Sequence, residues 1–355
     1  MIENNGSPII FEDMFLSDAF KKSIEEFFKL VFITDTNVEK IYAGKIKNAS
    51  TLKDKSIEII TIPAGEAFKN QTTKTYIEET MLDLGCGRDT LIIAVGGGVV
   101  TDIAGFVAAT FCRGVPIIYV PTSLLAMVDA AIGGKTAINT KHGKNLIGTF
   151  SLPKATFIDV NFLSTLPDAE YKSALSEIIK HALIYDADYF HLISTNINKI
   201  AGKDLSFMQD LIFTSCKIKS QIVAKDAKET NIRQICNFGH TIAHAVEKVA
   251  NYKVSHGDAV AIGIVIESYL SMLLGHLSSS QCSLIHRLIK DFKFKQLKDF
   301  NLDICKIIAA TKFDKKSRNK SVHIVLLNKI GEVYSVNGNF SHPIEHVILE
   351  DVLNK

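Results

Sequence analysis

The chain has 355 residues, of which 47% are hydrophobic and 22% are charged, and its formal net charge at pH 7 is +2. This composition is typical of a soluble globular protein with room for two domains. The balanced charge excludes a general electrostatic attraction to nucleic acid or acidic membranes. The longest apolar stretches contain Asp102 and Glu267, so neither suits a membrane span.

The first 160 residues alternate short apolar segments with helix-like segments. The apolar segments predict strands at 29–34, 57–62, 90–95 and 116–120. The segments between them predict helices near 37–46, 70–84 and 99–111. This alternation favours an α/β domain, in which a mostly parallel sheet is covered on both faces and functional groups collect at the carboxyl ends of the strands. We expect this domain to span residues 1–160.

From about residue 161 the pattern becomes mainly helical. Helices are expected at 168–186, 188–200, 205–229, 238–250, 257–276 and 279–292. One hairpin is expected from 322–327 to 332–336, and a last helix near 344–354. We expect these elements to form a second domain, residues 161–355.

The cysteine pattern bears on the compartment. No C-x-x-C pair occurs among the six scattered cysteines, which are Cys86, Cys112, Cys216, Cys236, Cys282 and Cys305. The first seven residues are polar and do not resemble a secretory signal. Reduced thiols in a cytoplasmic protein are therefore expected.

A glycine turn follows the strand expected at 90–95. Gly96, Gly97 and Gly98 end that strand, and a helix pattern begins directly after them. A helix N-terminus in this position offers free backbone N–H groups to a phosphate, so the turn predicts a pyrophosphate-bearing cofactor. Because the spacing departs from G-x-G-x-x-G, a tight strand-to-helix connection without a ligand is equally compatible with it.

Carboxylate and imidazole side chains gather in the second half. Glu177 and Lys180 lie one turn apart on one helical face, and His240 and His244 are spaced i, i+4 on another helix. One glutamate and three histidines, His256 included, indicate a zinc-type site. Spacing alone makes both His240 and His244 ligands, whereas the alternative is one functional and one packed histidine. A catalytic zinc usually has three protein ligands, so four candidates are one too many.

Motifs along most of the chain resemble the 3-dehydroquinate synthase family, within the sugar-phosphate cyclase superfamily. They run from the glycine turn through Ser176-Glu-Ile-Ile-Lys180 and Asn237-Phe-Gly-His-Thr-Ile-Ala-His244 to His256-Gly257, and the resemblance covers residues 29–338. Further matching motifs are Arg113-Gly-Val, Pro121-Thr, Gly133-Gly-Lys135-Thr, Gly143-Lys-Asn-Leu-Ile-Gly148, Leu166-Pro and Asp314-Lys-Lys316. The resemblance implies a Rossmann-like NAD-binding domain followed by a helical domain that binds one divalent metal and the substrate.

The resemblance also implies which residues hold the metal and the cofactor. Glu177, His240 and His256 would bind Zn²⁺ or Co²⁺, and His244 would contact the substrate phosphate instead. The implied NAD contacts are Asp35, Glu66, Lys69, Gly97, Gly98, Asp102, Thr122, Ser123, Lys144 and Thr165.

Substrate contacts and a partner subunit are implied in the same way. Asp129 would handle a proton. Arg113 would reach into the site of a neighbouring subunit, which implies a homodimer. The implied groups around the carboxylate, hydroxyls and phosphate of the substrate are Lys135, Asn145, Lys180, Lys219, Arg233, Asn237, His244 and one of Lys315 and Lys316.

The implied activity is that of a lyase of the shikimate pathway, in aromatic amino acid biosynthesis. It converts 3-deoxy-D-arabino-heptulosonate 7-phosphate into 3-dehydroquinate and phosphate. NAD takes a hydride and returns it after phosphate has left, a metal polarises the substrate oxygen, and an internal aldol step closes the ring. The alternatives are a sister cyclase whose substrate lacks the carboxylate, a metal-dependent alcohol dehydrogenase and a catalytically silent relative.

Some implied contacts have a purely structural alternative. Asp35 could be only a helix cap, Lys69 and Lys144 surface charges, and Glu177 an exposed helix residue. Three positions depart from the commonest family pattern, with Thr101 for glycine, Ser123 for threonine and Asp258 for glutamate.

Overall fold

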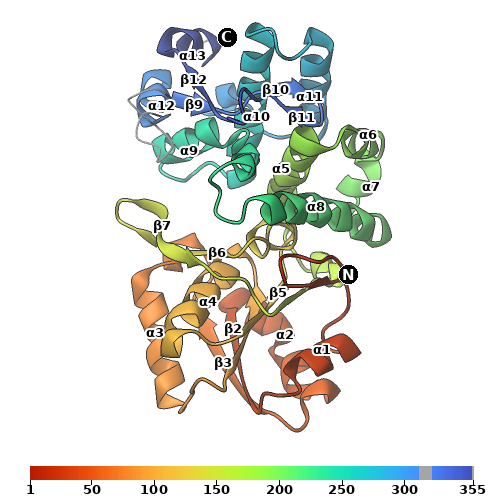
Figure 1. Cartoon of the computed structure of the whole chain (residues 1–355), viewed down its shortest axis with the longest axis vertical. Coiled ribbons are helices and arrows are strands. Elements are labelled where there is room, and N and C mark those ends of the chain that lie inside the picture. Colours follow the sequence, from red (N-terminus) through yellow and green to blue (C-terminus); the bar gives the residue numbers. More distant parts are fainter. Residues whose placement is uncertain (312–321, 354–355) are drawn as a thin grey trace. The chain divides into compact units, whose positions relative to one another are not determined.

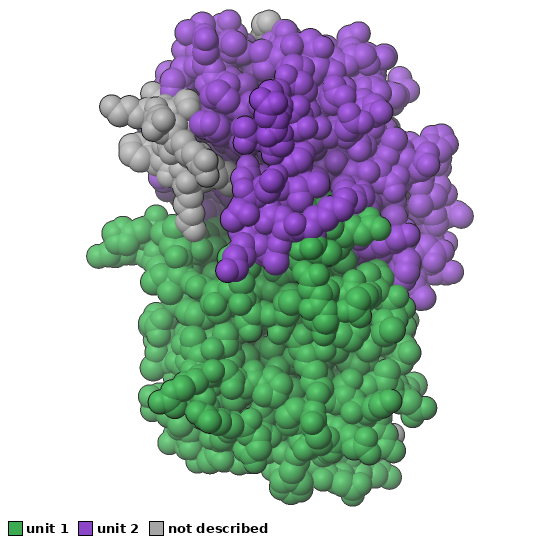
Figure 2. Space-filling view, viewed as in Figure 1, with its two compact units in different colours: residues 1–167, 219–224 green, residues 168–218, 225–355 purple. Residues whose placement is uncertain are grey.

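The computed structural model describes residues 1–311 and 322–353, which divide into two compact units (Figures 1 and 2). Unit 1 comprises residues 1–167 and 219–224, and unit 2 comprises the described residues of 168–218 and 225–355. Each unit contains fully buried apolar side chains, such as Ile93 in unit 1 and Ile264 in unit 2. Within the described residues, no helix is both long and apolar enough to cross a membrane.

Unit 1 contains a six-stranded parallel sheet with the strand order β1-β8-β5-β4-β2-β3. Its strands are β1 (Ile9–Ile10), β2 (Lys29–Asp35), β3 (Ser56–Ile62), β4 (Leu91–Gly96), β5 (Ile117–Pro121) and β8 (Ala155–Phe157). The four strands predicted from sequence are β2 to β5, and the predicted α/β fold class is confirmed. β1 and β8 are too short for a periodic pattern to identify.

The strand order reverses at β2. β3 lies on one side of β2 and β4 on the other, and β5 and β8 continue beyond β4. In such a sheet a ligand site is expected beyond the carboxyl ends of the strands where the order reverses. Those ends are Asp35 in β2 and Gly96 in β4, and close to them Thr34 Oγ1 donates a hydrogen bond to Val95 O at 2.8 Å.

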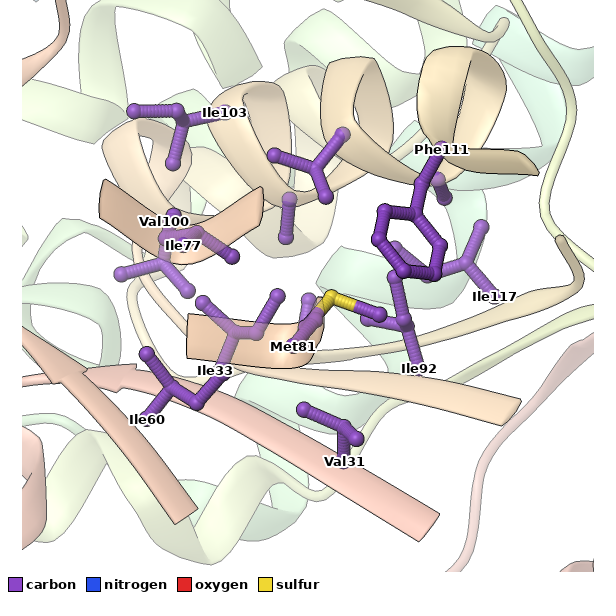
Figure 3. Close-up of a cluster of buried hydrophobic side chains, with 14 of the residues drawn as sticks. Val31, Ile33, Ile60, Ile77, Met81, Ile92, Val100, Ile103, Phe111 and Ile117 are labelled. Atoms are coloured by element: carbon purple, nitrogen blue, oxygen red, sulfur yellow. The ribbon is translucent and has the colours of Figure 1, made fainter. Parts of the chain in front are cut away.

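The core of unit 1 lies between this sheet and two helices, α3 (Gln71–Asp83) and α4 (Gly98–Thr110). Figure 3 shows Val100 and Ile103 of α4 and Ile77 of α3 gathered over Ile33 of the sheet. All six residues of β4 are buried, as expected for a central strand covered on both faces. The other helical segments are α1 (Asp18–Ile24), α2 (Thr36–Asn48), η1 (Ser50–Leu52), η2 (Glu66–Phe68), η3 (Phe111–Arg113) and η5 (Val160–Ser164).

An antiparallel hairpin, β6 (Lys135–Thr140) and β7 (Gly143–Phe150), follows a π-helical turn, η4 (Ala126–Ala130). β6 packs on α4 at Gly105, where a Cβ would collide with the side chains of Tyr119 and Thr136. Every residue of β7 is half-buried or exposed. The sequence did not predict this hairpin because polar residues interrupt both strands and glycines also interrupt β7, so neither strand has the apolar run that marked the sheet.

Unit 2 is mainly helical, as predicted. Its long helices are α5 (Asp168–Tyr185), α8 (Leu205–Lys225, of which residues 219–224 group with unit 1), α9 (His240–Val249), α10 (His256–Leu273) and α11 (Ser279–Asp291). Its shorter segments are α6 (Ala187–Thr195), α7 (Ile197–Ala201), η6 (Ile232–Asn237), η7 (Leu297–Asp299), α12 (Ile304–Thr311) and α13 (His346–Leu353).

Three element predictions for unit 2 were wrong in detail, two for helices and one for the hairpin. The helix expected at 188–200 is α6 and α7, because the backbone leaves the helical region at Asn196. The helix expected at 205–229 ends at Lys225, because the next side chain, Asp226, accepts backbone N–H groups from a loop.

The predicted hairpin is divided between two small sheets. β9 (Val322–Ile324) pairs with β12 (His342–Ile344), whereas β10 (Leu327–Lys329) pairs with β11 (Glu332–Val333). The apolar run 322–327 therefore contains β9 and the first residue of β10, and these two strands have different partners.

Candidate active site

The glycine turn of unit 1 has the geometry of an anion site. α4 begins directly after Gly97, which occupies the N-cap position without a side-chain cap. A Cβ on Gly97 would lie 3.2 Å from Ser123 Oγ, and one on Gly98 would lie 3.4 Å from Ala130 Cβ. Thr122 is buried and its N–H donates to Gly96 O at 2.9 Å. Because Gly97 has no side chain, it does not cap the first backbone N–H groups of α4, and these groups can donate to a phosphate.

Four of the residues implied by the resemblance form one polar network in unit 1. Lys69 Nζ is ion-paired with Asp102 Oδ2 and donates to Asn145 Oδ1 at 2.6 Å. Asn139 joins this pair to Glu66, because its side chain accepts from Asn145 N at 3.0 Å and donates to Glu66 Oε1 at 2.7 Å. Burial raises the pKa of Asp102, and Lys69 opposes that rise. Lys69 is only 4% exposed, so the surface-charge alternative is wrong for it.

The other implied cofactor residues are less closely grouped. Asp35 caps α2, because its Oδ1 accepts from Asn37 N at 2.8 Å and from Val38 N at 3.1 Å. Asp35 is therefore a helix cap, the structural role that the sequence left open for it. Thr165 Oγ1 is 2.7 Å from Tyr42 OH, and Lys144 is half-buried on β7.

Asp129 and Lys219 are brought together although they are 90 residues apart. Lys219 Nζ, on α8, donates to Asp129 O at 2.5 Å and to Asp129 Oδ1 at 2.6 Å. Asp129 lies in the π-helical turn η4, and such turns are frequent at functional sites. Lys219 is 6% exposed, so its ammonium depends on this carboxylate for charge compensation. Lys135 is exposed on β6.

Three side chains of unit 2 converge on one point. Glu177 Oε1, on α5, lies 3.2 Å from His240 Nε2 and 3.3 Å from His256 Nε2. These three ligand atoms all lie within 4.8 Å of one another. His240 and His256 are the first residues of α9 and α10, whereas Glu177 is inside α5 and 1% exposed. The alternative of an exposed helix glutamate is therefore wrong for Glu177.

His244 lies beside this cluster and is exposed, with its ring edge-on to that of His240 and the ring centroids 5.5 Å apart. Spacing alone predicted that both His240 and His244 are ligands. The geometry instead groups His240 with Glu177 and His256. The three converging residues are instead the ligand set that the resemblance implies.

The electrostatics of the cluster depend on its neighbours. Burial would raise the pKa of Glu177, but Lys180 and the two histidines hold it well below its usual value. Burial lowers the pKa of His240 to about 4. Burial also acts to lower the pKa of His256, but carboxylates near both of its ring nitrogens, those of Glu177 and Glu247, raise it to about 10. Glu247 Oε1 is 3.6 Å from His256 Nδ1.

The chemistry of this donor set fits a divalent metal. One carboxylate oxygen and two imidazole nitrogens match the three protein ligands of a catalytic zinc site. His240 Nδ1 lies 3.1 Å from Phe238 O, so an Nδ1–H tautomer directs the Nε2 lone pair toward the cluster. Lys180 Nζ is ion-paired with Glu177 Oε2, the carboxylate oxygen that does not face the histidines, and is itself buried.

A loop after α8 positions two further candidates. The Asp226 carboxylate accepts from the backbone N–H groups of Thr230, Asn231 and Arg233, at 3.0, 2.6 and 3.1 Å. Arg233 is 2% exposed, and its Nη1 donates to Ala227 O at 2.6 Å. The side chain of Asn237 donates to Glu229 Oε1 at 2.7 Å.

Sequence reasoning missed several residues of these clusters. Glu247 follows His240 by two helical turns, so its i, i+7 spacing was a usable signal. Asp226 and Glu229 gave none, because they lie in a polar loop without periodicity. The implied phosphate contacts Lys315 and Lys316 lie outside the described residues.

Arg113 is exposed at the end of η3, in a backbone with unusual dihedral angles. Its φ is +70°, and the preceding Cys112 has a φ of +50°. Non-glycine residues rarely adopt such values, and consecutive ones indicate local strain.

Comparisons with known proteins match most of the chain to one family. Residues 59–173 match the family model described as 3-dehydroquinate synthase N-terminal, and residues 174–317 match the one described as 3-dehydroquinate synthase C-terminal. The chain is 39% identical over 340 residues to a 3-dehydroquinate synthase of Chlamydia muridarum, covering 91% of this chain and 90% of that protein.

Solved structures show the same fold. A 2-deoxy-scyllo-inosose synthase complexed with carbaglucose-6-phosphate, NAD⁺ and Co²⁺ matches with a TM-score of 0.88 and 25% identity, over 98% of this chain and 95% of that one. A 2-epi-5-epi-valiolone synthase of Streptomyces hygroscopicus with NAD⁺ and Zn²⁺ bound matches with a TM-score of 0.88 and 24% identity, over 100% of this chain and 97% of that one.

Proposed function

This chain belongs to the 3-dehydroquinate synthase family, and we propose that its unit 1 binds the cofactor while its unit 2 binds the metal. Its function is that of a 3-dehydroquinate synthase, a lyase. The two domains proposed are an NAD-binding domain of residues 1–160 and a metal- and substrate-binding domain of residues 161–355. They differ from the two units in that unit 1 extends to residue 167 and includes residues 219–224. The single observation that carries the proposal is the convergence of Glu177, His240 and His256.

In unit 2 the three converging residues would hold Zn²⁺ or Co²⁺. The bound metal supplies a Lewis acid that polarises a substrate oxygen. Lys180 neutralises Glu177 from its other oxygen, so the buried carboxylate stays ionised as a ligand must be. The Co²⁺ bound to the similar 2-deoxy-scyllo-inosose synthase supports a divalent metal here.

In unit 1 the glycine turn would hold the pyrophosphate of NAD, which accepts a hydride and later returns it. The backbone N–H groups after Gly97 and Gly98 would donate hydrogen bonds to this anion. The ion pair with Asp102, a residue of the first turns of α4, holds the Lys69 side chain in place. The further proposed contacts are Asp35, Glu66, Thr122, Ser123, Lys144 and Thr165.

The substrate proposed is a sugar acid phosphate, because several lysines and an arginine of this chain are fixed in place by neighbouring groups. Lys180, Lys219 and Arg233 would hold its carboxylate and hydroxyls together with Asn237. Asp129, held by Lys219, would accept or return a proton. Lys135, Asn145, His244 and one of Lys315 and Lys316 would hold its phosphate.

A cytoplasmic homodimer is also part of the proposal. Arg113 is exposed and would contribute to the neighbouring subunit's site. Three large apolar side chains of β7 are 40–50% exposed, namely Leu146, Ile147 and Phe150, and exposed apolar side chains are available for a protein interface. The six cysteines all lie in the described part of the chain and none is in a disulfide, which suits a reducing compartment.

The deciding experiment measures phosphate release from the heptulosonate phosphate with catalytic NAD and added Zn²⁺ or Co²⁺, while NADH is followed by absorbance. We expect stoichiometric phosphate, no accumulating NADH, and complete loss of phosphate release with a chelator. Accumulating NADH would indicate a dehydrogenase. Absence of phosphate from this substrate, with release from a heptulose or hexose phosphate lacking the carboxylate, would indicate a sister cyclase.

A further inference from the structure

One buried peptide unit connects a second carboxylate of unit 2 to the proposed metal site. Its carbonyl oxygen, Phe238 O, lies 3.1 Å from His240 Nδ1. Its N–H, on Gly239, donates to Glu267 Oε2 at 2.6 Å. The C=O and N–H of one peptide are coplanar and point in opposite directions, so the two hydrogen bonds constrain the same plane.

Close packing of α9 on α10 makes this arrangement possible. Gly239 has a φ of +81°, in the left-handed region that favours glycine. A Cβ on Gly239 would lie 3.1 Å from Ile264 N, and a Cβ on Gly263 would overlap the carbonyl of Gly239. Two glycines therefore let the start of α9 lie directly on α10, within reach of Glu267.

Glu267 is an unusual residue at its place in the fold. It is fully buried inside α10, a largely apolar helix, and burying a carboxylate is costly unless it is hydrogen-bonded. The N-terminus of α10 itself is capped by a local serine, Ser255. α9 instead has Gly239 at its N-cap, without a side-chain cap of its own, and receives the carboxylate of a distant residue.

We propose that Glu267 is a positioning residue for the metal ligand His240 and acts through the Phe238–Gly239 peptide. The carboxylate of Glu267 fixes the plane of this peptide. It also increases the electron density on the peptide oxygen, Phe238 O, because hydrogen bonds in series strengthen one another. That oxygen then holds His240 as the Nδ1–H tautomer, with the Nε2 lone pair directed at the metal. Hydrogen bonds of this kind to the remote nitrogen of a histidine ligand tune metal affinity.

The second histidine of the cluster, His256, also has a glutamate near its Nδ1. Here the carboxylate of Glu247 lies beside the ring nitrogen without an intervening peptide. Both histidines of the cluster are thus oriented by a buried glutamate, one directly and one through a peptide. The inference rests on the proposed function, since it assigns Glu267 to the metal site proposed there.

The test compares full-length wild-type protein with Glu267→Gln, which preserves side-chain size but removes the charge. Zn²⁺ affinity is measured by competition with a chromophoric chelator, and the visible absorption spectrum of the Co²⁺-loaded protein reports ligand geometry. We expect affinity to fall about 10- to 100-fold and the Co²⁺ bands to shift. Ser268→Ala, at the next buried position of α10, is the control and should change neither.

The outcomes separate the two proposals. Wild-type protein that binds neither metal would overturn the proposed metal site. Wild-type protein that binds both, together with Glu267→Gln that binds them equally well and gives the same spectrum, would overturn only the role of Glu267. If Glu267→Gln fails to fold, the imidazole ¹⁵N shifts of the zinc-loaded wild type decide: Nδ1 protonation of His240 supports the inference, and Nε2 protonation overturns it.

Discussion

The two units hold their buried charges in different ways. In unit 1 each of two buried lysines has a carboxylate of its own, so that Lys69 pairs with Asp102 and Lys219 with Asp129. In unit 2 a single carboxylate, Glu177, is shared by three nitrogen-bearing side chains. A buried charge is costly without a partner, and both arrangements supply one. The second concentrates two imidazole nitrogens and a carboxylate oxygen around one point.

The first arrangement suits recognition of an anionic ligand group, whereas the second suits binding of a metal cation. A one-to-one pair keeps an ammonium charged and fixes its direction, which prepares it to hold an anionic group of a ligand. A shared carboxylate beside His240 and His256 presents three ligand atoms, which is the set that a catalytic zinc takes. The two kinds of cluster should therefore respond differently when one member is removed.

Removing the shared carboxylate should have the largest effect. In Glu177→Ala the metal loses its only anionic ligand of the three, and Lys180 loses its buried partner. We expect metal binding and turnover to fall below detection while the circular dichroism spectrum is preserved. Metal content after dialysis and phosphate release are the measurements. Glu170→Ala, an exposed glutamate on the same helix, is the control and should retain both.

Retention of metal and activity in Glu177→Ala would contradict the proposed difference between the two units. Bound metal and retained activity in Glu177→Ala would remove Glu177 from the ligand set and leave it as a buried ion-pair partner, as the carboxylates of unit 1 are.

The sequence predicted the fold better than it predicted the contacts of the site. Strands such as Leu91–Gly96 are continuous apolar runs because both faces of the sheet are covered, and such runs can be recognised without a structure. The β6–β7 hairpin is held by packing on α4 at Gly105 and has no apolar pattern of its own, so the placement of Lys135 and Asn145 was not foreseeable.

The same limit applies to the metal cluster. Its residue types and the i, i+4 histidines predicted a metal site, but spacing alone left four candidate ligands. The structure brings together Glu177, His240 and His256 because three separate helices meet there, and helix meetings depend on tertiary packing. Glu267 was noticed only as a charge that argues against a membrane span, since nothing local relates it to Gly239.

Removing a lysine of unit 1 should have a smaller and more selective effect. Lys219→Ala leaves the metal cluster of unit 2 unchanged but removes a charge-assisted hydrogen bond, worth about 1.5–3 kcal/mol, from a substrate anion. We expect KM for the heptulosonate phosphate to rise roughly 10- to 150-fold with metal content unchanged. Lys217→Ala, an exposed lysine on the same helix, is the matched control. A normal KM in Lys219→Ala would restrict Lys219 to its pair with Asp129.

The smallest effect is expected at Asp226, whose carboxylate is surrounded by backbone N–H donors rather than by cations. Burial acts to raise its pKa, but the N–H groups of Thr230, Asn231 and Arg233 outweigh this and lower it. Because the folded-state pKa is below the unfolded one, the carboxylate contributes stability above the unfolded value of 3.8, and this contribution is lost as the pH falls through the folded pKa.

In Asp226→Asn one acceptor oxygen becomes an NH₂ group facing the same donors, so the loop that positions Arg233 is weakened. We expect Tm at pH 7 to fall by a few degrees relative to wild type, and the difference to shrink progressively below the unfolded pKa. Thermal unfolding of metal-free protein across this pH range measures both, with the exposed Asp210→Asn as control. A Tm difference that persists undiminished in acid would mean that the shape of the side chain, and not its charge, stabilises the loop.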